Sequence, residues 1–595
     1  MTTTLARFGR CTAALLGLAA LLVAPAAAQA PAWQWGLQTT NPGPTDGSAA
    51  NGEAVAVDAA GRVYVVGSLL SNGPSSRSLS RSFGSAGSLT GTQKTFVAQA
   101  SAAGQWTWVL PVVAAGGGPN QPAQAHISAV TATPGGAVYA AGVATGDSLL
   151  VGTRYYPLPT PTGVAFVLRL DNTGAVQWLR SFATTGSGYQ LAPDPSTGGV
   201  VLAGAYQGTP TIGTTTLPPG MPRFEGSPFV ARLDAGGSWR GVVSVNGTSS
   251  VGPEFTMSVG PAGQVALVGS QFDGVLTFGG AFSLSVLSPT GRRAFVAQLN
   301  PNNTWGWAVG GTTGNSNAYG AAYTPTGTLW VGGNGADGAV VGSLTLALPN
   351  SVIYTSQAGY VVQFSAAGQP LTGQQLAPLN EGYCVVALLR TDAAGNVLAL
   401  GGVRGPNGPA QTTIGTRVLT APSDGILLFV VGMNPGGQWR YVAPVPNSAT
   451  PDGLEPVALA LDNSGGLCLV GNLYDRADFG PFALTGTTSP GSSFRQGNDL
   501  FLAKLANATA LAARPAAAAP ALACYPNPAH GTATLRLPAP TETTAPARVF
   551  DALGREVRRC PVPARAAEVA LDLSDLAPGL YLVRCGAAVG RLVVE

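Results

Sequence analysis

The feature that most constrains this chain is an internal repeat whose marker residues stay in step through seven copies. A glycine that ends an apolar run recurs at intervals of 62 to 75 residues. Its members are Gly67, Gly142, Gly204, Gly269, Gly333, Gly401 and Gly471. An aromatic residue opens the next apolar run of each copy, at Phe96, Phe166, Phe229, Phe295, Tyr360, Phe429 and Phe501. Repeats of this length are typical of folds in which each unit buries its core against neighbouring units.

Residues 255–309 show what one copy contains. Four short apolar runs, at 255–259, 265–268, 295–299 and 305–309, are separated by Gly, Pro and Asn. Such runs predict strands, so each copy is expected to form a four-stranded antiparallel unit with a long excursion before its third strand. The excursion carries a third column, an apolar residue followed by glycine. It occurs at Phe83-Gly84, Val151-Gly152, Ile212-Gly213, Phe278-Gly279, Val341-Gly342, Ile414-Gly415 and Phe479-Gly480.

The fourth strand indicates how the copies close on one another. Its tryptophan marker occurs at Trp106, Trp108, Trp178, Trp239, Trp305, Trp307 and Trp439. The seventh copy stops at Leu505 without such a strand, whereas Trp33 and Trp35 stand ahead of the first copy. We expect this N-terminal segment to complete the seventh unit and to close an all-β, seven-bladed β-propeller. The alternative is an open array or a pair of stacked sandwiches.

The repeat also has a family resemblance. Residues 61–67 (GRVYVVG), the Phe-Gly-x-x-x-Leu of the excursions and residues 497–505 (GNDLFLAKL) resemble the SBBP-type β-propeller repeat. Such repeats usually carry an Asp before the third strand, which Asp424 and Asp499 match approximately and most other copies lack. The resemblance covers about residues 33–505 and implies the fold more than the function.

The N-terminus has the pattern of a secretory signal peptide. Arg7 and Arg10 precede a short apolar run, and small residues lead to a cleavage position after Ala28. The run is shorter than the roughly 20 residues that a transmembrane helix needs. We therefore expect residues 1–28 to be removed and the mature chain to have no transmembrane span. The propeller would occupy residues 29–505.

An Ala/Pro-rich stretch, residues 506–523, is expected to be an interdomain linker. Residues 524–595 then predict a small Ig-like β-sandwich of six or seven short strands. A hairpin is expected around Asp551 and Gly554, with the glycine in the left-handed conformation. Pro578 and Gly579 predict a type II turn.

These last residues closely resemble the type A C-terminal sorting domain of the type IX secretion system. The match lies in residues 525–528, 549–554, 573–581 and 592–594. The sorting motif residues are Tyr525, Pro526, Asn527, Pro528, Asp551, Gly554, Pro578, Gly579 and Tyr581. The resemblance implies Sec export, translocation across the outer membrane by the type IX machinery, and removal of the domain near the linker. The product would be secreted or attached to the outer cell surface. The alternative is one more Ig-like module.

Candidate chemistry is sparse in this chain. The two histidines, His126 in an expected inter-blade loop and His530, cannot supply a multi-histidine metal site, and they make a Ser/His/Asp site hard to build. A pair of carboxylates, as in glycosidases, stays open. Recurrent turn aspartates are either calcium ligands or, as we favour, caps of their own turns. These are Asp58, Asp171, Asp234, Asp392 and Asp462. We predict no catalytic, cofactor-binding or metal-binding residue, and no enzyme.

Three further expectations concern partners and packing. The formal charge is +3 and no basic run occurs, so nucleic acid is not an expected partner. The fourth-strand tryptophans are expected to pack between units rather than to stack on sugars. A disulfide between Cys560 and Cys585 is left open. The expected function is binding of a glycan or a surface protein through loops at one end of the propeller. The alternatives are a secreted polysaccharide-acting enzyme and a structural envelope protein.

Overall fold

The computed structural model divides the chain into two compact units, Met1–Thr509 and Ala510–Glu595. It describes residues 31–41, 48–71, 79–91, 94–118, 121–221, 226–249, 251–252, 255–286, 291–348, 356–379, 382–405, 409–415, 417–421, 426–445, 454–486, 498–506, 522–537, 544–551, 555–585 and 588–595. The predicted signal peptide, most of the linker and Gly554 lie outside these ranges. The described residues form strands and one short 3-10 helix, η1 (Gly84–Ala86).

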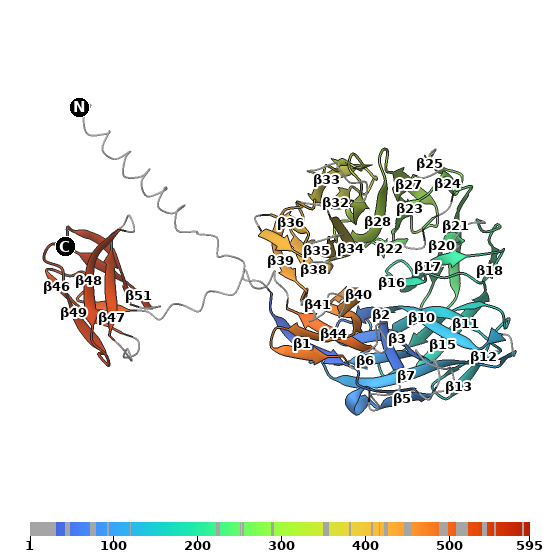
Figure 1. Ribbon diagram of the computed structural model, residues 1–595, viewed down its shortest axis with the longest axis horizontal. Coiled ribbons are helices and arrows are strands. Elements are labelled where there is room, and N and C mark those ends of the chain that lie inside the picture. The colour runs from blue at the N-terminus through green and yellow to red at the C-terminus, as the bar shows by residue number, and fades with distance from the viewer. Residues whose placement is uncertain are drawn as a thin grey trace. The chain divides into compact units, whose positions relative to one another are not determined.

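Within its described residues, the first unit contains seven antiparallel sheets that share one four-stranded plan, and two of them continue through an outer hairpin to six strands (Figure 1). From the inner to the outer strand they are β2–β3–β6–β7 (Ser48–Val57, Val63–Ser71, Lys94–Ala100, Trp106–Ala115), β10–β11–β14–β15 (Gln124–Ala132, Val138–Thr145, Val164–Leu170, Val176–Ala183), β16–β17–β20–β21 (Gln190–Asp194, Gly199–Tyr206, Ser227–Leu233, Trp239–Gly247), β22–β23–β26–β27 (Thr256–Val259, Val265–Gln271, Arg293–Leu299, Trp305–Gly310), β28–β29–β32–β33 (Ser316–Tyr323, Leu329–Gly335, Ala358–Phe364, Pro370–Leu376), β34–β35–β38–β39 (Tyr383–Thr391, Val397–Arg404, Ile426–Met433, Trp439–Pro444) and β40–β41–β44–β1 (Leu454–Leu461, Leu467–Leu473, Asp499–Leu505, Trp33–Gln38).

The glycine and aromatic columns of the repeat are one structural feature. In the first sheet Gly67 lies directly opposite Phe96, and in the last sheet Gly471 lies opposite Phe501. A Cβ on Gly67 would come within 2.7 Å of the Phe96 ring, and one on Gly471 within 2.8 Å of the Phe501 ring. The ring therefore lies over the glycine across the strand pair, which is why the two columns stay in step.

The third column forms the turn of a small hairpin in each copy. The seven hairpins are β4–β5 (Leu79–Ser82, Ser88–Gly91), β12–β13 (Ser148–Val151, Arg154–Pro157), β18–β19 (Thr211–Ile212, Thr215–Thr216), β24–β25 (Gly274–Phe278, Phe282–Val286), β30–β31 (Val340–Val341, Leu344–Thr345), β36–β37 (Gln411–Ile414, Arg417–Thr420) and β42–β43 (Arg476–Phe479, Phe482–Thr485). The column's glycines have φ between 55° and 64°, a conformation that favours glycine. The apolar residue before each of them is buried. One further short pair, β8–β9 (Gly117–Gly118, Gln121–Pro122), lies between the first two sheets in the chain.

The N-terminal strand pairs with the last copy, as the sequence predicts. β1 runs antiparallel to β44, with Leu37 opposite Leu502 and Gln38 opposite Phe501. The inner strands contact one another in chain order, and β40 also contacts β2 (Figure 1). One buried cluster joins the first and last sheets, for example Val65 of β3 and Val470 of β41. Segments far apart in the chain thus share a core.

The second unit is a two-sheet sandwich. One sheet has the order β45–β46–β49 (Ala523–Tyr525, Thr532–Arg536, Glu568–Asp572). The other has the order β48–β47–β50–β51 (Glu556–Val562, Ala545–Phe550, Gly579–Cys585, Ala588–Val594). Leu535 and Leu571 of the first sheet share one buried cluster with Val549 and Val583 of the second.

One local expectation for this unit is wrong, and the disulfide that the sequence left open is not formed. Gly579 is the first residue of β50 and its φ lies outside the left-handed region that a type II turn requires. Cys560 and Cys585 are both free. They flank the central strand on opposite sides, since each pairs with Ala547. Two strand spacings of about 4.8 Å hold them too far apart for a disulfide.

Candidate functional site

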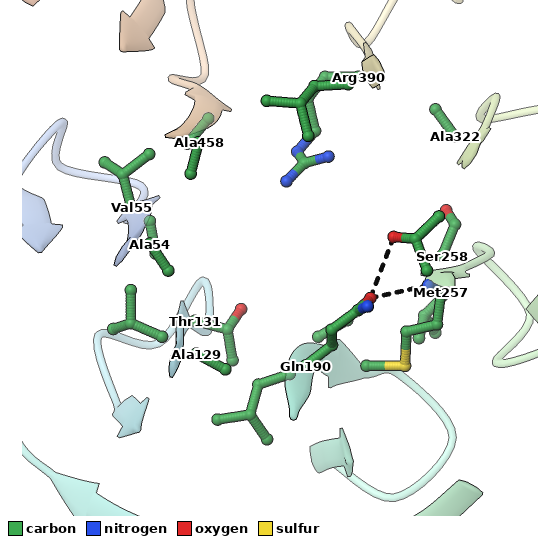
Figure 2. Close-up of a pocket in the computed structure, with 18 of the residues that line it drawn as sticks. Ala54, Val55, Ala129, Thr131, Gln190, Met257, Ser258, Ala322, Arg390 and Ala458 are labelled. Carbon is green, nitrogen blue, oxygen red and sulfur yellow. Dashed lines mark hydrogen bonds between the residues drawn. The ribbon is translucent and has the colours of Figure 1, made fainter. Parts of the chain in front are cut away.

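A cavity of about 640 Å³ lies where the seven inner strands converge (Figure 2). Every inner strand of the first unit contributes to its lining, from β2 through β40. Much of the lining consists of small side chains, such as Ala54, Ala129, Ala321 and Ala458. Small side chains on converging strands leave the space between them open. The volume falls within the range of about 300–1,000 Å³ that is usual for ligand sites.

Gln190 projects toward the cavity but is held in place by its neighbour sheet (Figure 2). Its Nε2 donates to the carbonyl oxygen of Phe255 at 2.6 Å. Its Oε1 accepts hydrogen bonds from the Thr256 hydroxyl at 3.0 Å and from the Met257 amide at 2.8 Å. The amide therefore joins two sheets, and its hydrogen-bonding capacity is largely used.

Arg390 of β34 points into the cavity from the opposite side (Figure 2). One guanidinium nitrogen, Nη1, donates to the carbonyl of Leu389 at 2.8 Å. Among the described residues, no carboxylate forms an ion pair with it. The side chain is reached by water inside the cavity. Protein nevertheless surrounds the cavity, and this burial lowers the pKa of Arg390 below its usual value.

A second charged group of the cavity is Glu53 of β2. Burial raises the pKa of Glu53; the nearby His126 and a hydrogen bond from Ser68 oppose this shift, and the charge of Glu455 adds to it. The Ser68 hydroxyl donates to Oε1 of Glu53 at 3.4 Å. Glu455 is itself engaged, since its Oε2 accepts from Asn472 at 3.2 Å. Glu53 thus senses the charges of one histidine and one further carboxylate.

His126 does not lie in a loop as the sequence analysis expected. It belongs to β10, where it pairs with Val143, because that strand begins two residues earlier, at Gln124. With Lys94 it lines a second cavity of about 380 Å³, whose other polar groups are mostly threonines. A third cavity, of about 560 Å³, is lined by turn residues such as Pro134 and Pro261.

The recurrent aspartates cap their own turns, as favoured from the sequence. Asp58 Oδ1 accepts from the amides of Ala60 at 2.9 Å and Arg62 at 3.0 Å. The same kind of bond occurs in the four other copies of the turn, those of Asp171, Asp234, Asp392 and Asp462. Within the described ranges, no three His, Cys, Asp or Glu side chains gather as a metal site would require.

The fourth-strand tryptophans join neighbouring sheets, as predicted. Trp108 Nε1 donates to the carbonyl of Asn172 at 3.3 Å, and Trp178 donates to that of Ala235 at 3.1 Å. In both cases the acceptor lies in a turn of the next sheet. Trp35 makes the same bond, at 3.1 Å, from β1 to Ala102 in the first sheet. The contact between the last and first sheets is therefore built like the interior ones.

A polar column that the sequence analysis missed supports the same contacts. It lies three residues after the third-strand aromatic and includes Gln99, Arg169 and Arg232. Arg232 is buried, forms an ion pair of 2.8 Å with Asp194, and donates to the carbonyl of Gly263 in the next sheet at 2.8 Å. Its fixed offset from the aromatic column is the signal that would have revealed it.

The described sorting motif residues anchor different segments of the sandwich. Asn527 donates to the carbonyl of Arg591 at 2.9 Å and accepts from the amide of Val593 at 2.8 Å. This ties the opening segment, Tyr525 to Pro528, to the last strand. Asp551 accepts from the amide of Arg555 at 2.9 Å, which caps the hairpin turn.

Tyr581 joins the core to an exposed turn. Its ring is buried in the sandwich core, and its hydroxyl donates to the carbonyl of Ala577 at 2.6 Å. Pro578 and Gly579, which follow Ala577, are exposed. They therefore shape the start of β50 and add nothing to the core.

Residues 523–594 match the family model described as "Secretion system C-terminal sorting domain". This is the sorting domain of the type IX secretion system. The chain is therefore exported and is either secreted or attached to the outer cell surface, and its C-terminal domain interacts with the secretion machinery. Among the described residues, no helix has the length and apolar character to cross a membrane.

No curated protein matches the chain. Among solved structures, a protein of unknown function from Dyadobacter fermentans is 10% identical with a TM-score of 0.37, covering 80% of this chain and 100% of its own. Drosophila Plexin A, in complex with Semaphorin 1b, is 9% identical with a TM-score of 0.34, covering 80% and 88%. An ulvan lyase of polysaccharide lyase family 25 is 10% identical with a TM-score of 0.28, covering 57% and 88%. At these scores, none of the three bears on what this chain does.

Proposed function

We propose that the first unit is a closed seven-bladed β-propeller of the SBBP type that acts as a binding module at the cell surface. Seven sheets of one plan, the pairing of β1 with β44 and the contact of β40 with β2 support the closed arrangement. Each sheet alone is too small to bury both its faces, whereas stacking in a closed series covers them.

The observation that carries the binding role is the central cavity. It is lined by rigid strands from all seven sheets, and polar groups such as Arg390, Glu53 and Ser258 stand among its small apolar side chains. Convergent polar groups in a preformed cavity are the usual means by which a ligand site orients its ligand. We propose that it binds part of a glycan, with a loop of a surface protein as the second class of ligand. The sorting domain delivers the module and is then removed.

A cavity-filling variant tests this role. Ala458 faces the cavity (Figure 2), whereas Ala483 lies exposed on the outer hairpin β42–β43. Ala458→Trp should abolish glycan binding by the exported protein on a glycan array, and the control Ala483→Trp should leave it intact. Equal binding by both variants would exclude the cavity as the site. If the unmodified protein binds nothing on the glycan array and nothing in a pull-down, the proposed binding role is refuted.

The rival function, a polysaccharide-acting enzyme, is favoured by Glu53 and its raised pKa. A raised pKa makes a carboxyl group better suited to act as a general acid. We nevertheless propose that the chain is not an enzyme. Incubation with a polysaccharide panel separates the two functions: new reducing ends that disappear in Glu53→Gln would establish the enzyme.

The proposed removal of the sorting domain is tested separately, by measuring the mass of the exported protein from a cell that has the type IX apparatus. Loss of residues 1–28 and of the segment after residue 523 is expected. Retention of the C-terminal domain on the exported protein would contradict its removal.

A further inference from the structure

Arg390 is the exception in a ring of small side chains. Each inner strand places one residue opposite the same position of the second strand, three residues before its marker glycine. At this level six sheets carry a small residue and one carries arginine. The seven are Ala56, Thr131, Ala192, Ser258, Ala322, Arg390 and Ala460.

The small residues leave room in front of the guanidinium. Figure 2 shows Arg390 reaching into this space, with Ser258 and Ala322 on one side of it and Thr131 across the cavity. Thr131 and Ser258 bring hydroxyl groups to the same level of the cavity. If this position served only to pack the inner strands, a seventh small residue would be enough. Packing therefore does not explain the long side chain of Arg390.

The charge of Arg390 has no balancing partner in the described structure. Its one hydrogen bond, of 2.8 Å to the Leu389 carbonyl, uses one of five N–H donors. Glu53, the carboxylate of the same cavity, lies on β2 three residues before Ala56. Three residues of a strand span about 10 Å, so Glu53 lies about that far along the cavity from the level of Arg390. A guanidinium that faces a cavity without a charge partner keeps most of its donors available, and bidentate oxyanions are its best ligands.

We propose that Arg390 is the anion-recognition residue of the central cavity and that the ligand carries an oxyanion, a carboxylate or sulfate group. This rests on the proposed binding role of the cavity and names its ligand class: an acidic glycan. The planar guanidinium would bind the oxyanion by two parallel hydrogen bonds, with the Thr131 and Ser258 hydroxyls as further donors.

The test is thermal unfolding and calorimetric titration of the exported protein with sulfate, glucuronate and glucose, at constant ionic strength set by sodium chloride. Sulfate and glucuronate should raise the Tm of the unmodified protein, and glucose should not. Arg390→Gln should weaken anion binding at least about tenfold, the size expected for losing a charge-assisted hydrogen bond. Arg404→Gln, an exposed arginine at the end of β35, is the matched control and should bind as the unmodified protein does.

Stability in chloride alone gives a second readout. Arg390→Gln removes an unpaired charge from the cavity, so its Tm without oxyanion should equal or exceed that of the unmodified protein. A loss of Tm would assign Arg390 a structural role and overturn the proposal. So would anion binding that Arg390→Gln leaves unchanged, or no response to either anion.

The outcomes also separate this inference from the proposed function. Arg390-dependent binding of sulfate with a blank glycan array would support the anion site and reject the glycan. Binding of neutral glycans that survives Arg390→Gln would support the module and reject the anion site.

Discussion

Replacing Trp35 by alanine tests whether the first unit is closed. Trp35 lies on β1, is only 8% exposed, and donates to the Ala102 carbonyl of the first sheet. Its ring also covers the turn at Gly104, where an added Cβ would meet it at 2.6 Å. Truncating a buried tryptophan costs about 3–5 kcal/mol, of which the hydrogen bond supplies about 1 kcal/mol.

The control is Trp178→Ala, at an interior contact between two sheets. Trp178 donates to Ala235 at the same 3.1 Å and covers Gly237 in the same way, but its side chain is less buried. If β1 closes the unit, Trp35→Ala should lower the urea midpoint at least as much as Trp178→Ala does. Trp35→Phe, which removes mainly the hydrogen bond, should cost about 1 kcal/mol.

Amide hydrogen exchange locates the effect. In Trp35→Ala, protection should fall in β44 and in the first sheet together, because both depend on β1. A Trp35→Ala variant as stable as the unmodified protein, beside a destabilised Trp178→Ala, would refute the closed arrangement. The N-terminal strand would then be an appendage that the fold does not need.

Four other experiments have defined outcomes. Arg232→Met leaves the Asp194 carboxylate buried without its partner and should cost about 3–5 kcal/mol by urea unfolding, with Arg232→Met/Asp194→Leu recovering most of it. Burial alone would raise the pKa of Asp194, but hydrogen bonds from Ser196 and Arg232 hold the pKa below its usual value. The stabilisation from this carboxylate is therefore present above about pH 4 and is lost as the pH falls further. Asp194→Asn should make the free energy of unfolding less dependent on pH in this acidic range. Gly368→Ala should destabilise more than Gly208→Ala, because both have positive φ but only the former would meet a tryptophan ring, at 2.5 Å. Thiol labelling of the denatured, unreduced full chain should find the cysteines of both units reactive.

The strands and the sheet plan could be predicted from the sequence because the repeat columns have a direct geometric cause. A glycine such as Gly67 recurs because an aromatic ring lies on it across the strand pair, so finding both columns amounts to finding the pairing. Trp33 and Trp35 lie ahead of the first complete copy, which predicted that their strand completes the seventh copy. β1 pairs with β44 as expected.

The cavity could not be predicted in the same way. Aligning copies emphasises what they share, whereas Arg390 matters because the other six copies differ from it at that position. Strand limits caused the other errors: His126 was assigned to a loop because no local signal marks Gln124 as the start of β10. The Pro578-Gly579 pair is common in turns, but its φ depends on the partner strand β51, which lies further along the chain.

The pairing of Gln38 with Phe501 also sets an order of assembly. β1 is synthesised long before β44, and it cannot pair with that strand until the seventh copy has been made. Closing so long a loop costs little more free energy than closing a shorter one, but contacts between distant segments form slowly. The first unit therefore stays incomplete while the chain is being synthesised. An exported protein benefits from that delay, because an unfolded chain is the form that a narrow translocation channel can pass.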